Sequence, residues 1–421
     1  MNYRLIKTQI EKANGLLRNI YRSNDIDRTV KVVYNGMFRQ PSFTFESKMV
    51  KIFGTQDFVK NHLNISKSKR KKSTDALRKR SFENLTKRDE LRLSYPIIKK
   101  VFNILDDKFA LVDVKFNPVS NLIAVDSLRK NVSSGYPNFK PKTEEAEDIF
   151  DQMNSWFLSE CSETNLFDDL LTGINWRTQV RKSGIKHRQV FTMPYLVQAF
   201  ESKFAQPFFA HFESIRGYSI YSYGETFHHL AKRWSKWQDY NNIYSLDIEA
   251  FDQSTNNAFI VLFFTWLKRH LNLTTQQQNH AFNMIIKYNL FCKISTSVDG
   301  KPFVFEKTAG VMSGSVFTNF MDTFINAFIL YYFQVENGVY ENSEVAICGD
   351  DIIFATNLEM NLTDLSKYYK RTFGYTISVE KSAIFKRNEQ VYFLGANFDN
   401  QKRSLDWNLA KLQLSVTERY D

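Results

Sequence analysis

Short apolar runs alternate with longer segments of helical periodicity in the second half of the chain. Residues 244–248, 345–348 and 352–355 are apolar runs of strand length, and only three residues separate the last two. Alternation between residues 294 and 306 around Asp299-Gly300 predicts a β-hairpin. Apolar residues at helical spacing predict helices over 257–273, 275–290 and 314–333. This order of elements predicts an α/β fold.

The turn Gly349-Asp350-Asp351 joins two of these strands and is the first candidate for chemistry. Aspartate and glycine are favoured in turns for backbone reasons, so the tripeptide alone is most simply an ordinary hairpin turn. Two adjacent carboxylates repel each other, however, and a bound divalent cation is the usual remedy. The turn by itself leaves both interpretations open.

A second acidic element, SLDIEAFDQS, changes this balance. It places Asp247 at the end of a strand and Asp252 five residues later, just before the next helix. If this strand lies beside the Gly349 hairpin, Asp247 and Asp350 can hold two Mg²⁺ ions about 3.5–4 Å apart, as in-line phosphoryl transfer requires. Mg²⁺ suits such a site because it binds a few carboxylates and keeps other positions for water and phosphates.

A third element is the segment 310–326, in which Ser313-Gly314 interrupts the chain before an amphipathic helix. Thr318, Asp322 and Asn326 follow at four-residue steps and therefore share one helix face. Such a polar stripe is commonly a structural set of buried hydrogen bonds. It can equally line a pocket for a sugar.

Composition restricts the class of protein. The 421 residues are 43% hydrophobic, enough for a large core divided into two or three lobes. A net charge of +11 favours polyanionic partners, and segment 66–92 carries much of it, with eleven basic residues against four acidic ones. This segment opens with KSKRKK at 67–72 and predicts a helix over 74–93 that ends before Pro96. Taken alone, it is most simply a solvated charged helix and loop.

Cysteine usage and apolar runs indicate the compartment. Cys161, Cys292 and Cys348 have no paired spacing, which argues against a disulfide framework and a zinc module. The start of the chain has charges where a signal peptide needs an apolar core. The strongest apolar run, 258–267, is shorter than the ~20 residues of a membrane span. We therefore expect a soluble intracellular protein without membrane contact.

Six or seven ordered segments between residues 133 and 398 resemble the motifs of viral RNA-dependent RNA polymerases of the picornavirus-like supergroup. SLDIEAFD resembles the first palm motif, which makes Asp247 a metal ligand and Asp252 the residue that senses the ribose. SGSVFTNFMD resembles the second. CGDD at 348–351 resembles the third, with Asp350 the second principal metal ligand and Asp351 in support. GYTISVEKS resembles the fourth, in which Lys381 donates a proton to the leaving pyrophosphate.

Other segments resemble the parts that hold RNA and nucleotide. SSGYP, comprising Ser133, Ser134, Gly135, Tyr136 and Pro137, resembles a template-guiding motif. VYFLGANF, with Phe393, Leu394 and Gly395 at its centre, resembles the hairpin that grips the primer. The segment 177–190 resembles the basic motif over the triphosphate, and its candidates are Arg181, Lys186 and Arg188. The nucleotide-binding set would add Asp252, Ser313, Gly314, Thr318, Asp322 and Asn326.

The resemblance implies a right-hand α/β polymerase with fingers, an antiparallel palm sheet packed on helices, and a thumb. The expected domains are an N-terminal extension with fingers over 1–110, fingers over 111–235, a palm over 236–390, and a primer-grip hairpin with a thumb remnant over 391–421. It implies two Mg²⁺ ions, for which Mn²⁺ can substitute. The implied partners are an RNA template and product strand, NTPs and a viral capsid protein, in the host cytoplasm or inside the virion.

The form SGSxFTxxxD and the short length resemble the partitivirus and picobirnavirus side of the supergroup. Two features depart from the picornavirus pattern. Asp322 stands where that pattern has Asn, so Asp252 would face another carboxyl and a proton, a water or a cation must lie between them. Only about 23 residues follow Phe398, so we expect a thumb that is very small, built partly by other segments, or missing because the chain is incomplete.

Two rival functions share part of this pattern. A reverse transcriptase has the same palm and metal carboxylates, but the Ser313-Gly314 motif and the polar Asp252 favour ribonucleotides. A non-catalytic RNA-binding or capsid-associated protein with a polymerase-like fold is the other. Intact Asp247, Asp350 and Lys381 argue against it. Beside a polymerase core, the 67–72 segment also becomes a candidate for contact with RNA phosphates.

Overall fold

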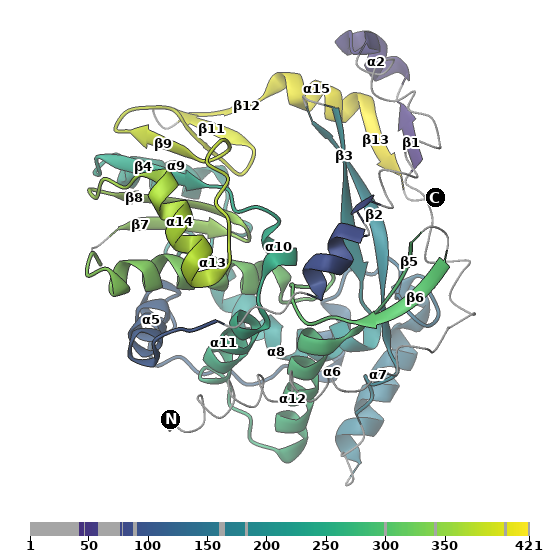
Figure 1. Ribbon diagram of the computed structural model, residues 1–421. Coiled ribbons are helices and arrows are strands. Elements are labelled where there is room, and N and C mark those ends of the chain that lie inside the picture. The colour runs from purple at the N-terminus through teal and green to yellow at the C-terminus, as the bar shows by residue number, and fades with distance from the viewer. Residues whose placement is uncertain are drawn as a thin grey trace.

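The computed structural model of the chain describes residues 42–45, 47–57, 76–77, 79–86, 91–159, 165–181, 184–298, 301–340, 343–399 and 402–419. The predicted segment 67–72, the turn Asp299-Gly300 and Cys161 lie outside the described residues. Figure 1 shows two sheets on opposite sides of the molecule with a bed of helices below them.

The first sheet has four antiparallel strands in the order β7-β8-β4-β9. Its strands are β4 (Asn242–Leu246), β7 (Glu344–Cys348), β8 (Asp351–Thr356) and β9 (Ala383–Lys386). The antiparallel sheet predicted for the palm is present. β8 is an almost unbroken apolar run because both of its faces are buried. Ile352 and Phe354 belong to the main core, whereas Ile353 and Ala355 face a smaller second core.

Helices cover both faces of this sheet. The main-core face packs against α13 (Thr318–Glu336), a helix buried on nearly all sides, which also packs against α5 (Tyr95–Lys108) and α11 (Asn257–Lys268). α14 (Leu362–Phe373) adds Leu365, Tyr369 and Phe373 to this core. The opposite face packs against α9 (Phe227–Trp237) through Trp234 and Trp237.

The second sheet has the order β3-β2-β5-β6 and contains a long two-stranded ribbon. The strands are β2 (Leu171–Arg181), β3 (Gly184–Thr192), β5 (Lys293–Val298) and β6 (Lys301–Glu306). β2 pairs antiparallel with β3 and parallel with β5. β5 and β6 fall inside the range predicted for the palm, yet they join the ribbon sheet. The sequence boundary at residue 236 therefore does not coincide with the division between the sheets.

A helical bed lies beneath the ribbon. It comprises α6 (Asn121–Asp126), α7 (Lys142–Leu158), α8 (Tyr195–Ser214) and α12 (Gln276–Phe291). α8 contacts α6, α7 and α12, and its residues between Tyr195 and Ala205 are almost all buried. α12 begins with a complete capping box between Thr275 and Gln278, which satisfies two backbone N–H groups at its start.

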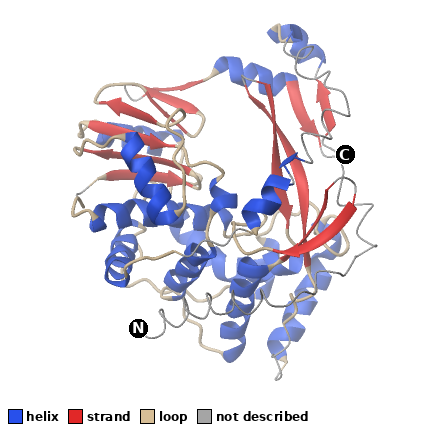
Figure 2. Cartoon of the chain, in the orientation of Figure 1, coloured by secondary structure: helices blue, strands red, loops and turns tan. Residues whose placement is uncertain are grey.

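The C-terminal part leaves the first sheet and reaches the ribbon. β10 (Val391–Phe393), β11 (Ala396–Asp399) and β12 (Lys402–Leu405) form an antiparallel sheet of three strands. α15 (Trp407–Ser415) then crosses above the space between the two sheets and contacts β2 (Figures 1 and 2). The last strand, β13 (Val416–Arg419), pairs with β1 (Ser42–Phe45), and α15 also packs on α2 (Ser47–Phe53). The segment predicted as a thumb remnant thus connects the first sheet to the ribbon sheet.

Three predicted helix boundaries differ from the observed ones. Residues 79–85 are helical, but residues 91–94 are not, and Pro96 lies in the first turn of α5 rather than after a helix end. Helix α11 ends at Lys268, five residues before the predicted 273. The helix predicted from residue 314 begins only at Thr318, since side chains from other elements hold residues 312–317 in a loop.

Candidate active site

The two acidic elements meet at one end of the first sheet. β4 and β8 are in register with Leu246 opposite Ile352, so Asp247, the next residue along, faces Asp351 and the turn. Gly349 has a left-handed φ of 66°, which allows the tight turn between β7 and β8. Asp247 is half-buried, and Asp350 and Asp351 are exposed. The sheet therefore presents three carboxylates from two strand ends.

Side chains of helix α13 hydrogen-bond to the turn Gly349-Asp350-Asp351. The backbone N–H of Gly349 donates to Thr323 Oγ1 at 2.8 Å, and Asn326 Nδ2 donates to the carbonyls of Gly349 and Asp350 at 3.3 and 3.2 Å. Asn319 lies so close that a Cβ on Gly349 would be 3.1 Å from its Nδ2. Asn326 is buried, so the contact it makes is with the turn. Its predicted contact with nucleotide stays a prediction.

Lys381 lies on the other side of Asp247. β4 also pairs with β9, and Lys381 Nζ is 3.3 Å from Asp247 Oδ1. The backbone N–H of Asp247 donates to Ser382 Oγ at 3.0 Å, which fixes the strand end. Both side chains of the ion pair are about half exposed, so the pair contributes little to stability. The ammonium group of Lys381 can therefore leave Asp247 and pair with another anion at little cost in stability.

Asp252 and Asp322 form a hydrogen-bonded pair of carboxyl groups. Ala250 adopts a left-handed φ of 49°, and this bend carries the chain from β4 into the short helix α10 (Phe251–Ser254). Burial and the charges of Asp252 and Asp350 raise the pKa of Asp322 well above its ordinary value. The raised pKa favours the protonated form of Asp322, which would donate the hydrogen bond to Asp252. Of the three possibilities for this pair, the arrangement supports a proton between the carboxyls.

The remaining acids of the cluster share these charges. Burial and the charge of Asp350 raise the pKa of Asp252 to about 6, although Arg188 and the bond from Asp322 oppose the shift. Partial desolvation and the charges of Asp350 and Asp247 raise the pKa of Asp351 to about 6 as well, again opposed by Arg188. Excess negative charge thus accumulates at the end of the sheet, and Arg188 of β3 faces Asp252 and Asp351 while Lys381 pairs with Asp247.

Whether these groups fit a metal follows from their chemistry and spacing. Within the described residues, no three Asp, Glu, His or Cys side chains converge closely enough to hold an ion. The donors are nevertheless exposed oxygen ligands that repel one another, and Mg²⁺ prefers oxygen ligands. Asp247, Asp350 and Asp351 thus fit a hard divalent cation in type and charge, once their side chains turn toward it.

Two glycine motifs that are distant in sequence pack on the end of β3. The backbone N–H of Phe191 donates to Ser313 Oγ at 2.9 Å, and a Cβ on Gly314 would lie 2.3 Å from the carbonyl oxygen of Phe191. A Cβ on Gly135 would lie 2.7 Å from the carbonyl oxygen of Met193. Only glycine permits such approaches. The segments 133–137 and 313–314 are thus brought to the same backbone.

The other predicted residues are less closely tied to the acids. Arg188 is exposed, whereas the side chains of Arg181 and Lys186 lie outside the described set. Phe393 is buried and packs edge-on against Trp237, with ring centroids 6.1 Å apart. Ser134 and Thr318 are bonded within the protein: Ser134 O accepts from Tyr195 N, and Thr318 Oγ1 lies 2.6 Å from the carbonyl oxygen of Met312. Their predicted roles stay predictions.

Sequence reasoning did not select the residues that support the Ser313-Gly314 loop. Gln198 and Glu201, one turn apart on α8, both bond to this loop. The signal in the sequence was a carboxylate in a segment rich in aromatic and aliphatic residues. Thr323, which accepts from the Gly349 turn, was also missed because it lies next to Asp322 and off the predicted polar stripe.

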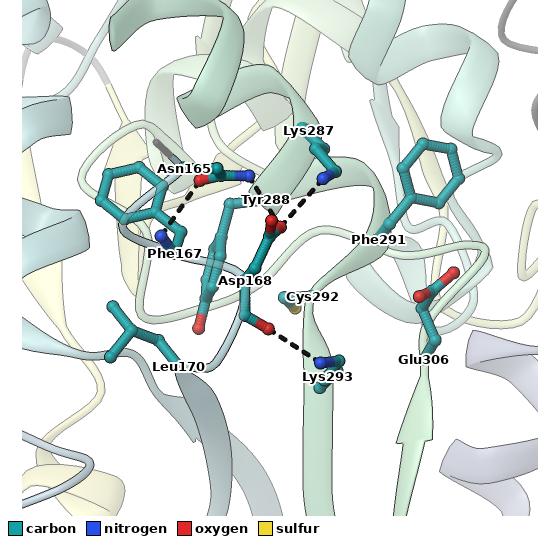
Figure 3. Close-up of a pocket in the computed structure, with 10 residues that line it drawn as sticks. All are labelled: Asn165, Phe167, Asp168, Leu170, Lys287, Tyr288, Phe291, Cys292, Lys293 and Glu306. Carbon is teal, nitrogen blue, oxygen red and sulfur yellow. Dashed lines mark hydrogen bonds and ion pairs between the residues drawn. The ribbon is translucent and has the colours of Figure 1, made fainter. Parts of the chain in front are cut away.

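A pocket of about 200 Å³ lies away from the acidic cluster, beside the ribbon sheet (Figure 3). Asp168 pairs with Lys287 at 2.9 Å, and its backbone carbonyl accepts from Lys293 at 2.8 Å, whereas Glu306 Oε1 has no hydrogen-bond partner among the described residues. Tyr288 and Cys292 form part of its wall. None of the predicted site residues lines it.

The chain is similar in sequence to one protein family and in structure to several solved proteins. A family model described as viral RNA-dependent RNA polymerase matches residues 64–417. The crystal structure of a human picobirnavirus RNA-dependent RNA polymerase has a TM-score of 0.68 at 15% identity, covering 94% of this chain and 80% of that chain. The structure of an insertion-loop deletion mutant of a human picobirnavirus polymerase has a TM-score of 0.65 at 16% identity, covering 97% of this chain and 82% of that chain. The structure of the Sicinivirus 3Dpol polymerase has a TM-score of 0.63 at 12% identity, covering 80% of this chain and 77% of that chain. No curated protein matches the chain.

The solved structures share the right-hand polymerase fold and thereby confirm the predicted fold class. No helix among the described residues is long and apolar enough to cross a bilayer. The family match spans most of the chain and confirms the resemblance inferred from the motifs. The chain belongs to the family of viral RNA-dependent RNA polymerases and is an RNA-directed RNA polymerase.

Proposed function

We propose that this polymerase joins an NTP to an RNA 3′-hydroxyl and releases pyrophosphate at the end of the first sheet, with Asp247, Asp350 and Asp351 as the ligands of two Mg²⁺ ions. The observation that carries the proposal is the placement of these three carboxylates at neighbouring strand ends, Asp247 after β4 and Asp350-Asp351 at the start of β8, with a raised pKa at Asp351. When bound, the cations supply charge neutralisation for the triphosphate and activation of the hydroxyl. Mn²⁺ can take their place.

The chain's own residues position the reactants. Arg188 faces the acidic cluster and would contact phosphate oxygens bidentately. Lys381 would leave Asp247 and give its proton to the departing pyrophosphate. Asp252, kept in place by the neutral Asp322, would accept a hydrogen bond from a ribose hydroxyl. The positioning of these groups, rather than a side-chain nucleophile, accounts for catalysis.

The test is extension of a primed and an unprimed single-stranded RNA template, with NTPs or dNTPs, in Mg²⁺ and after chelation. We expect ribonucleotide incorporation that requires Mg²⁺. Preferential use of dNTPs would favour a reverse transcriptase. No extension under any of these conditions by a folded protein would favour a non-catalytic RNA-binding role.

We also propose that the enzyme works in the host cytoplasm, or inside the virion with a capsid protein as partner. The excess of basic residues supports binding of an RNA genome. Fractionation of infected cells and of purified particles tests this proposal, and recovery of the chain with membranes alone would contradict it.

A further inference from the structure

Helix α8 carries a carboxylate in the interior of the protein. Glu201 has no exposed surface and accepts hydrogen bonds from three neutral donors. Ser315 Oγ and Asn289 Nδ2 donate to its Oε1 at 2.9 and 2.7 Å, and the backbone N–H of Val316 donates to its Oε2 at 2.7 Å. Burying a charge is costly, and removal of this carboxylate would leave three buried donors unpaired, so Glu201 and its donors act as one hydrogen-bonded unit. The segments that this unit joins indicate its role.

The donors show what Glu201 holds. Ser315 and Val316 belong to the loop 312–317, and Gln198, one turn earlier on α8, donates to the carbonyl of Gly314 at 2.7 Å. Gln198 is itself bonded to the buried Lys142 of α7. Gln198 and Glu201, three residues apart on one face of α8, thus bond to the neighbouring loop residues Gly314, Ser315 and Val316.

The loop in turn connects to the acidic cluster. The backbone N–H of Val311 donates to the carbonyl of Asp252 at 2.7 Å. At its other end the loop leads directly into α13, which supplies Asp322 to Asp252 and Thr323 to the Gly349 turn. A shift of the loop would therefore move groups on both sides of the nucleotide site.

We propose that Glu201 is a positioning residue for nucleotide incorporation: as a carboxylate it holds the loop 312–317, and with it Ser313, Gly314 and the start of α13, in the conformation that the reaction requires. Glu201 touches no reacting atom. This inference rests on the proposed polymerase reaction and assigns a residue that acts on it from behind.

Protonation of Glu201 should make this positioning role dependent on pH. Burial raises the pKa of Glu201 to about 7, although its three hydrogen bonds oppose the shift. Above this pH the carboxylate accepts all three bonds, and below it an O–H group faces groups that are themselves donors. The titratable and charged groups nearby are Tyr288 and Cys292 next to Asn289, Lys307 beside Cys292, and Lys142 beside Gln198. The hold on the loop should strengthen as pH rises through about 7.

The experiment compares full-length wild type, Glu201→Gln and Glu213→Gln in single-turnover ATP incorporation between pH 6 and 8.5. Glu213 is an exposed residue of the same helix that pairs with Arg216, so its variant is matched in charge but does not touch the loop. At pH 8 we expect Glu201→Gln to be about 10-fold to 100-fold slower, since small misplacements of reactants have effects of this size. It should also lose the part of the pH dependence centred near 7, whereas Glu213→Gln should match wild type.

Controls separate the possible failures. Thermal melting at pH 8 checks the fold of each variant. If Glu201→Gln does not fold, Ser315→Ala, which removes one donor to Glu201, takes its place. We expect this variant to be slowed less and to show a smaller change of rate with pH near 7. Wild type without activity would refute the proposed function rather than this inference. An active wild type would refute the inference if the variant keeps the wild-type rate, or if it is slower with an unchanged pH profile, because a purely structural residue would behave in that way.

Discussion

Carboxyl groups with raised pKa values occur in two contrasting settings around the loop 312–317: Asp252, Asp322 and Asp351 belong to the acidic cluster at the end of the first sheet, and Glu201 lies on α8. The acids at the end of the first sheet face one another, and Asp350 and Asp351 are exposed. Glu201 is fully buried and faces three donors. The first group has unmet charge and open coordination positions, as a ligand site requires. The second group is saturated by the protein, as a support requires.

This difference teaches how to separate a binding carboxylate from a supporting one. Both kinds have perturbed pKa values, so the shift alone does not distinguish them. Burial is the largest cause in both settings, so the second cause makes the distinction. Neighbouring carboxylate charges add to the shift at the end of the first sheet and leave a demand for a cation, whereas hydrogen bonds from three donors oppose the shift at Glu201.

The largest effect is expected for Asp350→Asn. The change removes a principal charge from the exposed cluster, while asparagine fits the same turn position. We expect incorporation to fall by at least about 10³-fold in Mg²⁺, because a metal ligand site supplies several kcal/mol to the transition state. Primer extension and thermal melting measure the two properties. Activity within a few-fold of wild type would contradict the metal assignment.

Next in size is Lys381→Leu. Loss of a general acid costs roughly 10²–10⁴-fold in rate. The ammonium group lies beside Asp247 without being buried, so its removal should leave the fold intact. Rapid-quench kinetics should show a lower maximal rate with nearly unchanged apparent affinity for ATP. A loss confined to affinity would mean that Lys381 is only an electrostatic contact.

Asp252→Ala should change selectivity more than rate. A pocket that bonds a hydroxyl rejects the analogue without it, because a buried polar partner left unpaired costs ~1–3 kcal/mol. The efficiency for ATP should therefore fall more than that for dATP opposite a templating U. Equal losses for both substrates would make Asp252 a structural residue.

Asp322→Asn is the matched control for that pair. Because the raised pKa of Asp322 favours a protonated carboxyl that donates to Asp252, an amide that also donates should replace it with little loss of ATP use. A severe defect would mean that the negative charge of Asp322 is needed. The same ATP and dATP efficiencies measure this outcome.

The smallest effect is expected from the basic segment 67–72, outside both carboxylate groups and outside the described residues. Changing its lysines to glutamine should flatten the salt dependence of RNA binding, by about 0.7 in slope for each single-strand phosphate that the protein no longer neutralises. Incorporation at saturating RNA should not change. A wild-type slope would return the segment to a solvated loop.

The exposed cluster could be predicted because its residues lie in short, ordered motifs. Asp247 and Asp350 follow apolar strands, so a strand-end position could be inferred from each motif alone. The pairing of β4 with both β8 and β9 then brings Asp247 between Asp351 and Lys381. Local patterns were therefore sufficient for β4, β7 and β8 and for helices α11 and α13, but not for α5, α9 and α14.

The support could not be predicted in the same way. Glu201 and Ser315 are 114 positions apart, and their contact depends on how α8 packs beneath the ribbon. The late start of α13 has the same origin, because the loop before it follows these distant bonds rather than its own helical periodicity. The placement of β5 beside β2 is likewise a long-range pairing. Local sequence carries little information on such contacts.

The most direct test of the distinction is the Mg²⁺ dependence of single-nucleotide extension in wild type, Asp351→Asn and Glu201→Gln. We predict that Asp351→Asn raises the Mg²⁺ concentration needed for half-maximal rate, because a ligand charge is lost. Glu201→Gln should keep the wild-type midpoint at a lower maximal rate, because only positioning is lost. Extension that needs no divalent cation, or a midpoint that moves equally in both variants, would contradict the account.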